Sequence, residues 1–248
     1  MENSITLRRW LAETLAAPKV NYYQLSLGEI AKFPAGSKPR LLLHACCGPC
    51  SCFPLTFLCE HFSVTIYYNN SNIYPESEFC HRRDELERLL RDIKKDYGYE
   101  VGLIVPPYDN AAFTRDLAPF AAAREGGERC FVCYRKRMKE AYDFAEREGY
   151  DYFCTVMTIS RQKNSQVLNR IGRELEQEGE HKTKYFYSDF KKDGGIEKGR
   201  RIRDRYGLYS QLYCGCAYTY QDGLRRQQER QQREDARSDT GVPAGQEK

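Results

Sequence analysis

The sequence predicts an α/β fold in which a parallel sheet is flanked by helices. Between about residues 38 and 220, short apolar runs alternate with longer stretches of helical periodicity. The runs are nearly continuous and rich in β-branched and aromatic residues, as strands covered on both faces are. This alternation is typical of doubly wound, Rossmann-like sheets. A chain of 248 residues is long enough for a single domain of this kind.

Five apolar runs are the predicted strands: residues 40–45, 63–68, 99–105, 152–157 and 184–188. The clearest helix between them begins after Pro75 and ends before Gly98. Its apolar residues recur at helical spacing: Phe79, Leu86, Leu90, Ile93 and Tyr97. A second helix is predicted from about Glu128 to Glu148, closed by Gly149, and a third is expected to begin near Ser51.

The two ends of the chain differ from this central part. We expect residues 1–37 to form a helical extension, residues 38–220 the catalytic α/β domain, and residues 221–248 a charged, flexible tail that is helical near its start. The stretch 222–248 has six basic and six acidic residues and no aromatic residue. No apolar run reaches the roughly 18 residues of a membrane helix, and the N-terminus lacks a signal-peptide pattern. A cytoplasmic protein without a membrane partner is therefore expected.

Cysteine is the unusual component of the chain. Eleven cysteines in a cytoplasmic protein are not explained as an extracellular disulfide framework. Eight of them form three groups: Cys46, Cys47, Cys50 and Cys52; Cys130 and Cys133; Cys214 and Cys216. The other three stand alone and are most simply core residues: Cys59, Cys80 and Cys154. Clustered thiols indicate metal binding or redox chemistry.

The first group lies in HACCGPCSC, residues 44–52, where a core strand turns into a helix. Ligands bind at the carboxyl ends of strands in doubly wound folds, and amides at a helix N-terminus lower a thiol pKa. Metal or cluster ligation is the favoured interpretation. The alternatives are a thioredoxin-type redox pair in the CGPC segment and cysteines packed as small hydrophobes. His44, beside these cysteines, is a candidate proton donor, whereas His61, His81 and His181 are more simply surface or core residues.

Cys130 and Cys133 lie one helical turn apart, so both sulfurs can point the same way. Two separate cysteine pairs suggest four-thiolate coordination of zinc or of an iron–sulfur cluster. A position at the mouth of the sheet favours a working metal over a structural one. Cys214 and Cys216, in YCGC, could close only a strained, exchangeable disulfide. A redox pair, additional metal ligands and incidental cysteines all remain open for this last group.

The stretch from Lys182 to Arg205 holds nine basic and four acidic residues, a net charge of +5 in a chain whose total is +4. Its interleaved aromatic residues are typical of a surface that follows phosphates and stacks on bases. The alternative is a solvated helix face. Because the stretch leads directly into the YCGC segment, RNA binding is favoured, with Arg161, Lys163 and Asn164 as further contacts.

Together these motifs resemble the epoxyqueuosine reductases of the QueH family, which act on tRNA. The likeness covers about residues 41–216, from the strand ending in HACC through YYNNSNIYP, ERCFVC and SRQKN to GLYSQLYCGC. It implies an oxidoreductase that removes the epoxide oxygen of epoxyqueuosine at the tRNA wobble position and gives queuosine. It further implies a [4Fe–4S] cluster, no cobalamin, and an electron donor that the sequence does not identify.

The resemblance also implies residue roles. The cluster ligands would be Cys46, Cys47, Cys130 and Cys133, and the redox-active disulfide pair would be Cys214 and Cys216. Cys50 could bind an additional iron ion, replace one of these ligands, or do neither. Deoxygenation also requires an acid for the departing oxygen, and His44 and Tyr213 are the candidates.

Two other functions fit parts of the sequence. An iron–sulfur tRNA thiolase has a PP-loop-like layout, which this fold shares, but its loop normally reads SGGxDS. Here cysteines replace the glycines of that loop, and the aspartate is missing. The other alternative is a non-catalytic, zinc-binding RNA module.

Overall fold

The computed structural model describes residues 2–180 and 182–239 and contains a five-stranded parallel sheet in the order β3-β2-β1-β4-β5. The strands are β1 (Arg40–His44), β2 (Ser63–Tyr67), β3 (Gly102–Ile104), β4 (Tyr152–Thr155) and β5 (Lys184–Tyr185). In the centre of the sheet, Leu41 pairs with Val64 on one side and with Tyr152 on the other. The predicted α/β class is confirmed.

All five predicted strands are present, and all are shorter than expected, β1 and β2 by one residue and the other three by two to four. Strand β4 ends at Thr155, whose hydroxyl accepts a hydrogen bond from the amide of Met157 and begins a 3-10 turn, η2 (Val156–Ile159). Strands β3 and β5 form the two edges of the sheet, so each has only one neighbour to extend its ladder. Apolar composition predicted the strands well and their ends poorly.

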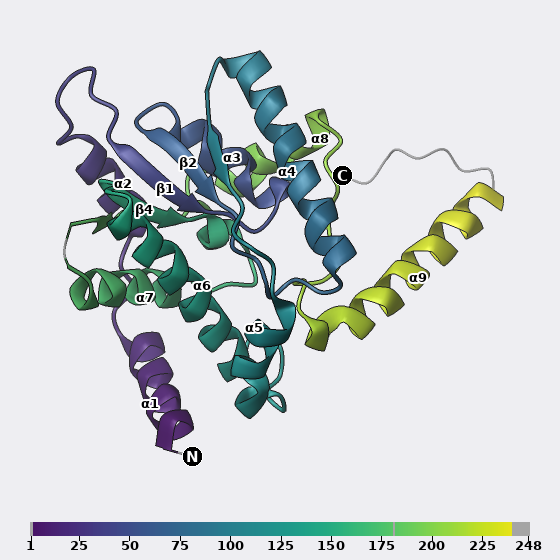
Figure 1. Cartoon of the computed structure of the whole chain (residues 1–248). Coiled ribbons are helices and arrows are strands. Elements are labelled where there is room, and N and C mark those ends of the chain that lie inside the picture. Colours follow the sequence, from purple (N-terminus) through teal and green to yellow (C-terminus); the bar gives the residue numbers. More distant parts are fainter. Residues whose placement is uncertain (1, 181, 240–248) are drawn as a thin grey trace.

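Helices cover both faces of the sheet (Figure 1). On one side lie α2 (Tyr22–Ile30), α3 (Gly48–Leu58), α4 (Glu76–Tyr97) and α8 (Gly195–Arg205). On the other side lie α1 (Glu2–Ala16), α5 (Asn110–Leu117), α6 (Glu128–Arg147) and α7 (Ser165–Glu178). A 3-10 turn, η1 (Ala118–Phe120), follows α5. The helices predicted after Pro75 and from Glu128 are confirmed, and the one expected near Ser51 begins at Gly48.

The alternation of side chains along the strands builds one core on each face. Leu41 and Leu43 pack with α3 and α4, whereas Leu42 between them packs with α6 and α7. Strand β4 repeats the pattern, because Cys154 faces the first core and Phe153 the second. Both cores are continuous, so the central strands are buried on both sides, as their unbroken apolar sequence predicted.

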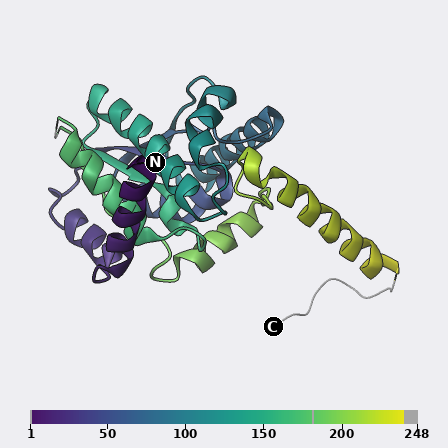
Figure 2. The same ribbon diagram turned by 90° about the horizontal axis from the view of Figure 1, so that it is seen from below.

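The N-terminal extension forms helices α1 and α2, and helix α9 (Ala217–Asp239) follows the YCGC segment. Helix α9 extends away from the rest of the molecule (Figure 2). The tail expected over 221–248 is thus helical as far as Asp239, and residues 240–248, like His181, lie outside the described residues. Within 2–180 and 182–239, no helix combines the length and the apolar composition that crossing a membrane requires.

Candidate active site

The cysteine groups gather where the strand order reverses. The chain leaves β1 toward α3 on one face, and it leaves β4 toward α7 on the other. In doubly wound sheets, ligands bind in the crevice that opens between two such neighbouring strands. The turn with Cys46 and Cys47 follows β1, and the segment leading to Lys163 follows β4. Both segments therefore border this crevice.

The sulfurs of Cys46, Cys47 and Cys50 all lie within 4.8 Å of one another. The Sγ atoms of Cys46 and Cys47 are 3.8 Å apart. Two thiolates bound to one tetrahedral ion at about 2.3 Å lie roughly 3.8 Å apart, so this spacing fits ligands on one metal. These three cysteines could bind a metal, and three ligands leave one tetrahedral position free.

The local fold holds this turn in place. The side-chain amide of Asn70 donates to the carbonyl of Ala45 (2.7 Å), and the hydroxyl of Ser51 donates to the carbonyl of Cys47 (2.8 Å). Nε2 of Gln211 donates a hydrogen bond to Sγ of Cys47 at 3.0 Å. Hydrogen bonds to ligand sulfurs are among the devices by which a protein sets the potential of a bound iron–sulfur cluster.

The three sulfurs share one negative charge. Hydrogen bonds from the thiols of Cys47 and Cys50 lower the pKa of Cys46, against burial, and Lys163 and Arg137 lower it further. The same contacts raise the pKa of Cys47 to about 12 and raise that of Cys50. A thiolate on Cys46 is therefore stabilised before any metal binds. Thiolates are the form in which cysteine binds metal.

Cys130 and Cys133 lie in the first two turns of α6, and the amide of Gly126 donates to Sγ of Cys130 at 3.2 Å. Burial raises the pKa of both thiols, that of Cys133 to about 12. In the described part of the chain, neither sulfur joins the close group of Cys46, Cys47 and Cys50. The close group thus contains Cys50, which lies outside the set of four ligands that the resemblance implies, and that set stays a prediction.

Cys214 and Cys216 lie in a loop that a buried arginine holds. Arg82 donates to the carbonyls of Cys214 (3.1 Å) and Tyr213 (3.3 Å), and its Nε donates to Glu78 (2.7 Å). Gly215 has a φ of +116°, and a Cβ there would lie 2.9 Å from Arg82, so glycine is required between the two cysteines. All eleven cysteines of the chain are free thiols in this structure.

Two cations connect the three cysteine groups. Arg137 is buried, which lowers its pKa, but Cys133, Cys46 and Cys214 raise it by more. Lys163 behaves in the same way, because burial is outweighed by Cys214 and Cys46 among its neighbours. The sequence analysis missed Arg137, although it lies four residues after Cys133 and therefore on the same face of α6. Its charge lowers the pKa of Cys46 and of Cys133.

The two candidate proton donors lie in unexpected surroundings. His44 is fully buried with Nδ1 2.8 Å from the hydroxyl of Thr155, and burial, with Arg137, lowers its pKa to about 3. A neutral imidazole is a poor acid at neutral pH, which argues against His44. The hydroxyl of Tyr213 donates to the carbonyl of Tyr74 (2.5 Å), and burial raises its pKa. Neither side chain is presented as a free acid.

This gathering of thiols and buried cations at the switch point of a parallel sheet defines an α/β protein with a thiol-rich site that could bind a metal. The sequence model of the family "Epoxyqueuosine reductase QueH" matches residues 41–222. The chain is 34% identical over 203 residues to the epoxyqueuosine reductase QueH of Staphylococcus aureus, covering 81% of this chain and 84% of that protein. It is 33% identical to the protein of that name from Streptococcus pyogenes (86% and 84%) and 28% to that from Thermotoga maritima (72% and 89%). The chain belongs to the epoxyqueuosine reductase QueH family.

Proposed function

We propose that this protein is an epoxyqueuosine reductase that converts epoxyqueuosine in tRNA to queuosine without cobalamin. The observation that carries the proposal is the convergence of three cysteine groups on Arg137 and Lys163, in a chain of the QueH family. Seven cysteines of these groups border one crevice, which is more than a single tetrahedral ion can bind. A four-thiolate cluster and a separate redox pair would use six of them and leave Cys50.

In this proposal, a [4Fe–4S] cluster is held by Cys46, Cys47, Cys130 and Cys133, and Cys50 is available to an additional iron ion. When bound, the cluster supplies single electrons and an electrophilic metal site. Arg137 is placed to balance the negative charge of four thiolates in a buried setting. Gln211 and the amide of Gly126 orient one sulfur from each pair.

The reaction removes one oxygen atom and consumes two electrons and two protons, with water as the second product. The thiols of Cys214 and Cys216 together hold that number of electrons and protons, and they release both when they form a disulfide. An external electron donor must then reduce the disulfide. The hold of Arg82 on the carbonyls of this loop keeps the two thiols beside the other groups.

The test is anaerobic turnover of tRNA that carries epoxyqueuosine, with dithionite as reductant. The nucleosides are then released and analysed by mass spectrometry. We expect epoxyqueuosine to be replaced by queuosine, which has one oxygen atom fewer, without added cobalamin or ATP. A sulfur-containing nucleoside formed only with ATP would indicate a thiolase. Bound zinc without iron, with no change in the tRNA, would indicate an RNA-binding module.

A further inference from the structure

A cavity of about 590 Å³ opens beside the crevice, between the segment before α2 and the N-terminus of α7. Five basic residues line it: Lys19, Arg161, Lys163, Lys191 and Lys192. Asp189 is the one carboxylate among its lining residues. The positive end of the α7 dipole adds to this charge. We call this cavity the cationic pocket.

The cations of this pocket are largely unneutralised. Lys191 pairs with Asp189 at 3.2 Å. Among the residues that the structure describes, the other four make no ion pair with a carboxylate. Helix α8 shows the opposite arrangement, because all five of its basic side chains are paired with carboxylates at 2.6–3.2 Å: Lys198, Arg200, Arg201, Arg203 and Arg205. The stretch that looked most suited to RNA in sequence is thus largely neutralised in α8.

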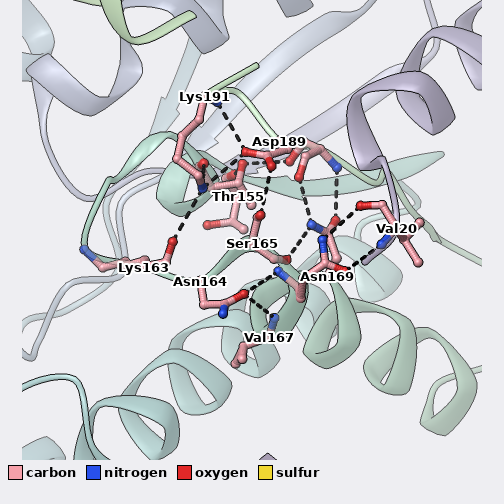
Figure 3. A network of polar contacts seen from close by, with 12 residues as sticks. Val20, Thr155, Lys163, Asn164, Ser165, Val167, Asn169, Asp189 and Lys191 are labelled. Carbon is pink, nitrogen blue, oxygen red and sulfur yellow. Dashed lines mark hydrogen bonds and ion pairs between the residues drawn. The ribbon is translucent and has the colours of Figure 1, made fainter. Parts of the chain in front are cut away.

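The pocket is held by a polar network (Figure 3). Nζ of Lys191 donates to the carbonyl of Thr158 (2.7 Å), and the hydroxyl of Ser165 donates to Asp189 (2.9 Å). The side chain of Gln166 exchanges two hydrogen bonds with the backbone of Val20, at 2.9 and 3.0 Å. These contacts join the N-terminal extension to α7. These hydrogen bonds therefore hold the lining segments together against the repulsion between the cations.

Lys163 connects the cationic pocket with the cysteine site. It lines the cationic pocket, and its charge interacts with Cys214, Cys46 and Cys50. An anion bound in the pocket would therefore lie next to the thiols. Phosphate contacts position a nucleic acid and leave its base free for recognition, so a phosphate held in the pocket would leave the neighbouring base free to approach the thiols.

We propose that the cationic pocket binds a backbone phosphodiester of the RNA substrate, next to the nucleotide that is reduced. This inference rests on the proposed function and adds to it the place where the RNA backbone is held. Arg161 and Lys192 lie at the exposed side of the pocket and supply charge without contacting the thiols. Arginines on α8 attract a phosphate less, because the carboxylates beside them offset their charge.

The test is binding of a synthetic tRNA anticodon stem-loop at several salt concentrations. The double variant Arg161→Gln/Lys192→Gln removes two pocket charges, and Arg200→Gln/Arg201→Gln removes two charges from α8 as the matched control. We expect the pocket variant to bind about tenfold more weakly and to lose about two from the slope of log Kd against log salt. The α8 variant should retain most of the affinity and slope. Iron content and visible absorption, measured in parallel, should match the wild type in both.

Equal losses in the two variants, or no loss in the pocket variant, would overturn the pocket assignment. The assignment would also be overturned if ATP or inorganic phosphate bound in the pocket and the affinity for the RNA did not change. Reduction of tRNA by the wild type is scored separately. If the wild type binds RNA through the pocket but does not reduce it, the proposed function is wrong and the assignment of the pocket is kept. If the wild type reduces tRNA and the pocket variant binds RNA normally, only the assignment of the pocket is wrong.

Discussion

The thiols at the rim of the sheet and those inside its core differ in the charges around them. Cys46 accepts hydrogen bonds from two neighbouring thiols and faces Lys163 and Arg137, which all lower its pKa. Cys154, on strand β4, has burial as the largest influence, which raises its pKa to about 12, and Ser188 as its side-chain partner. A reactive thiol is therefore set by the hydrogen-bond donors and cations that lower its pKa, and not by the cysteine alone.

The largest effect should come from removing a sulfur at the rim. Cys47→Ala deletes a member of the three-sulfur group, so we expect loss of bound iron and of reductase activity to background. Cys154→Ala in the core is the matched control and should retain both. Iron analysis, visible absorption and tRNA turnover measure the effect. Full iron content in Cys47→Ala would contradict the claim that rim thiols bind the metal and core thiols do not.

The next effect separates two kinds of rim thiol. Cys214→Ser removes half of the proposed redox pair but leaves Cys46, Cys47, Cys130 and Cys133 intact. We expect turnover to fall to background while iron content and visible absorption stay at the wild-type level. Cys80→Ser, a lone cysteine on α4, controls for thiol loss in general. A colourless Cys214→Ser protein would make this thiol a metal ligand instead.

A smaller effect is expected at a neighbour of the sulfurs. Gln211→Leu removes the hydrogen bond to Sγ of Cys47. Losses of this kind at metal sites typically cost 10- to 100-fold in metal affinity or activity. Gln211→Glu keeps the shape of the side chain but lacks the Nε2 donor, so this variant should lose as much metal affinity as Gln211→Leu. Chelator competition measures the metal affinity, and an unchanged value in both variants would contradict a role for this contact.

The smallest effect on chemistry is expected in the core. Cys154→Ala should lower the free energy of unfolding by about 1–2 kcal/mol, because it leaves a small cavity beside Ser188. Its activity per folded molecule should equal that of the wild type. Denaturant unfolding measures the free energy of unfolding, and tRNA turnover measures the activity. A loss of activity without a loss of stability would show that core thiols take part in the chemistry.

Much of the fold followed from local sequence signals. Continuous apolar runs predicted the strands because these strands are covered on both faces, and a proline and a glycine marked the ends of α4. Strand ends were predicted less well, because β4 stops where the side chain of Thr155 accepts a hydrogen bond from the amide of Met157. Composition carries no information about such a contact.

The site was only partly predictable. Clustering identified the thiols, since cysteines spaced one turn apart must lie together. The partners that make them reactive come from distant segments: Arg82 and Gln211 reach the site from α4 and from the loop before α9. Residue counts do not show how the charge of α8 is paired, because Glu197 and Asp204 lie within reach of its arginines only in the fold.

The central claim is that separate cysteine groups share one iron–sulfur centre. It is tested most directly by iron and sulfide analysis, with visible absorption, of anaerobically purified wild type and Cys130→Ala. We expect a brown wild type with about four iron and four sulfide ions per chain and a colourless, inactive variant. A Cys130→Ala protein with full iron, colour and activity would contradict it, as would a wild type that holds zinc without iron.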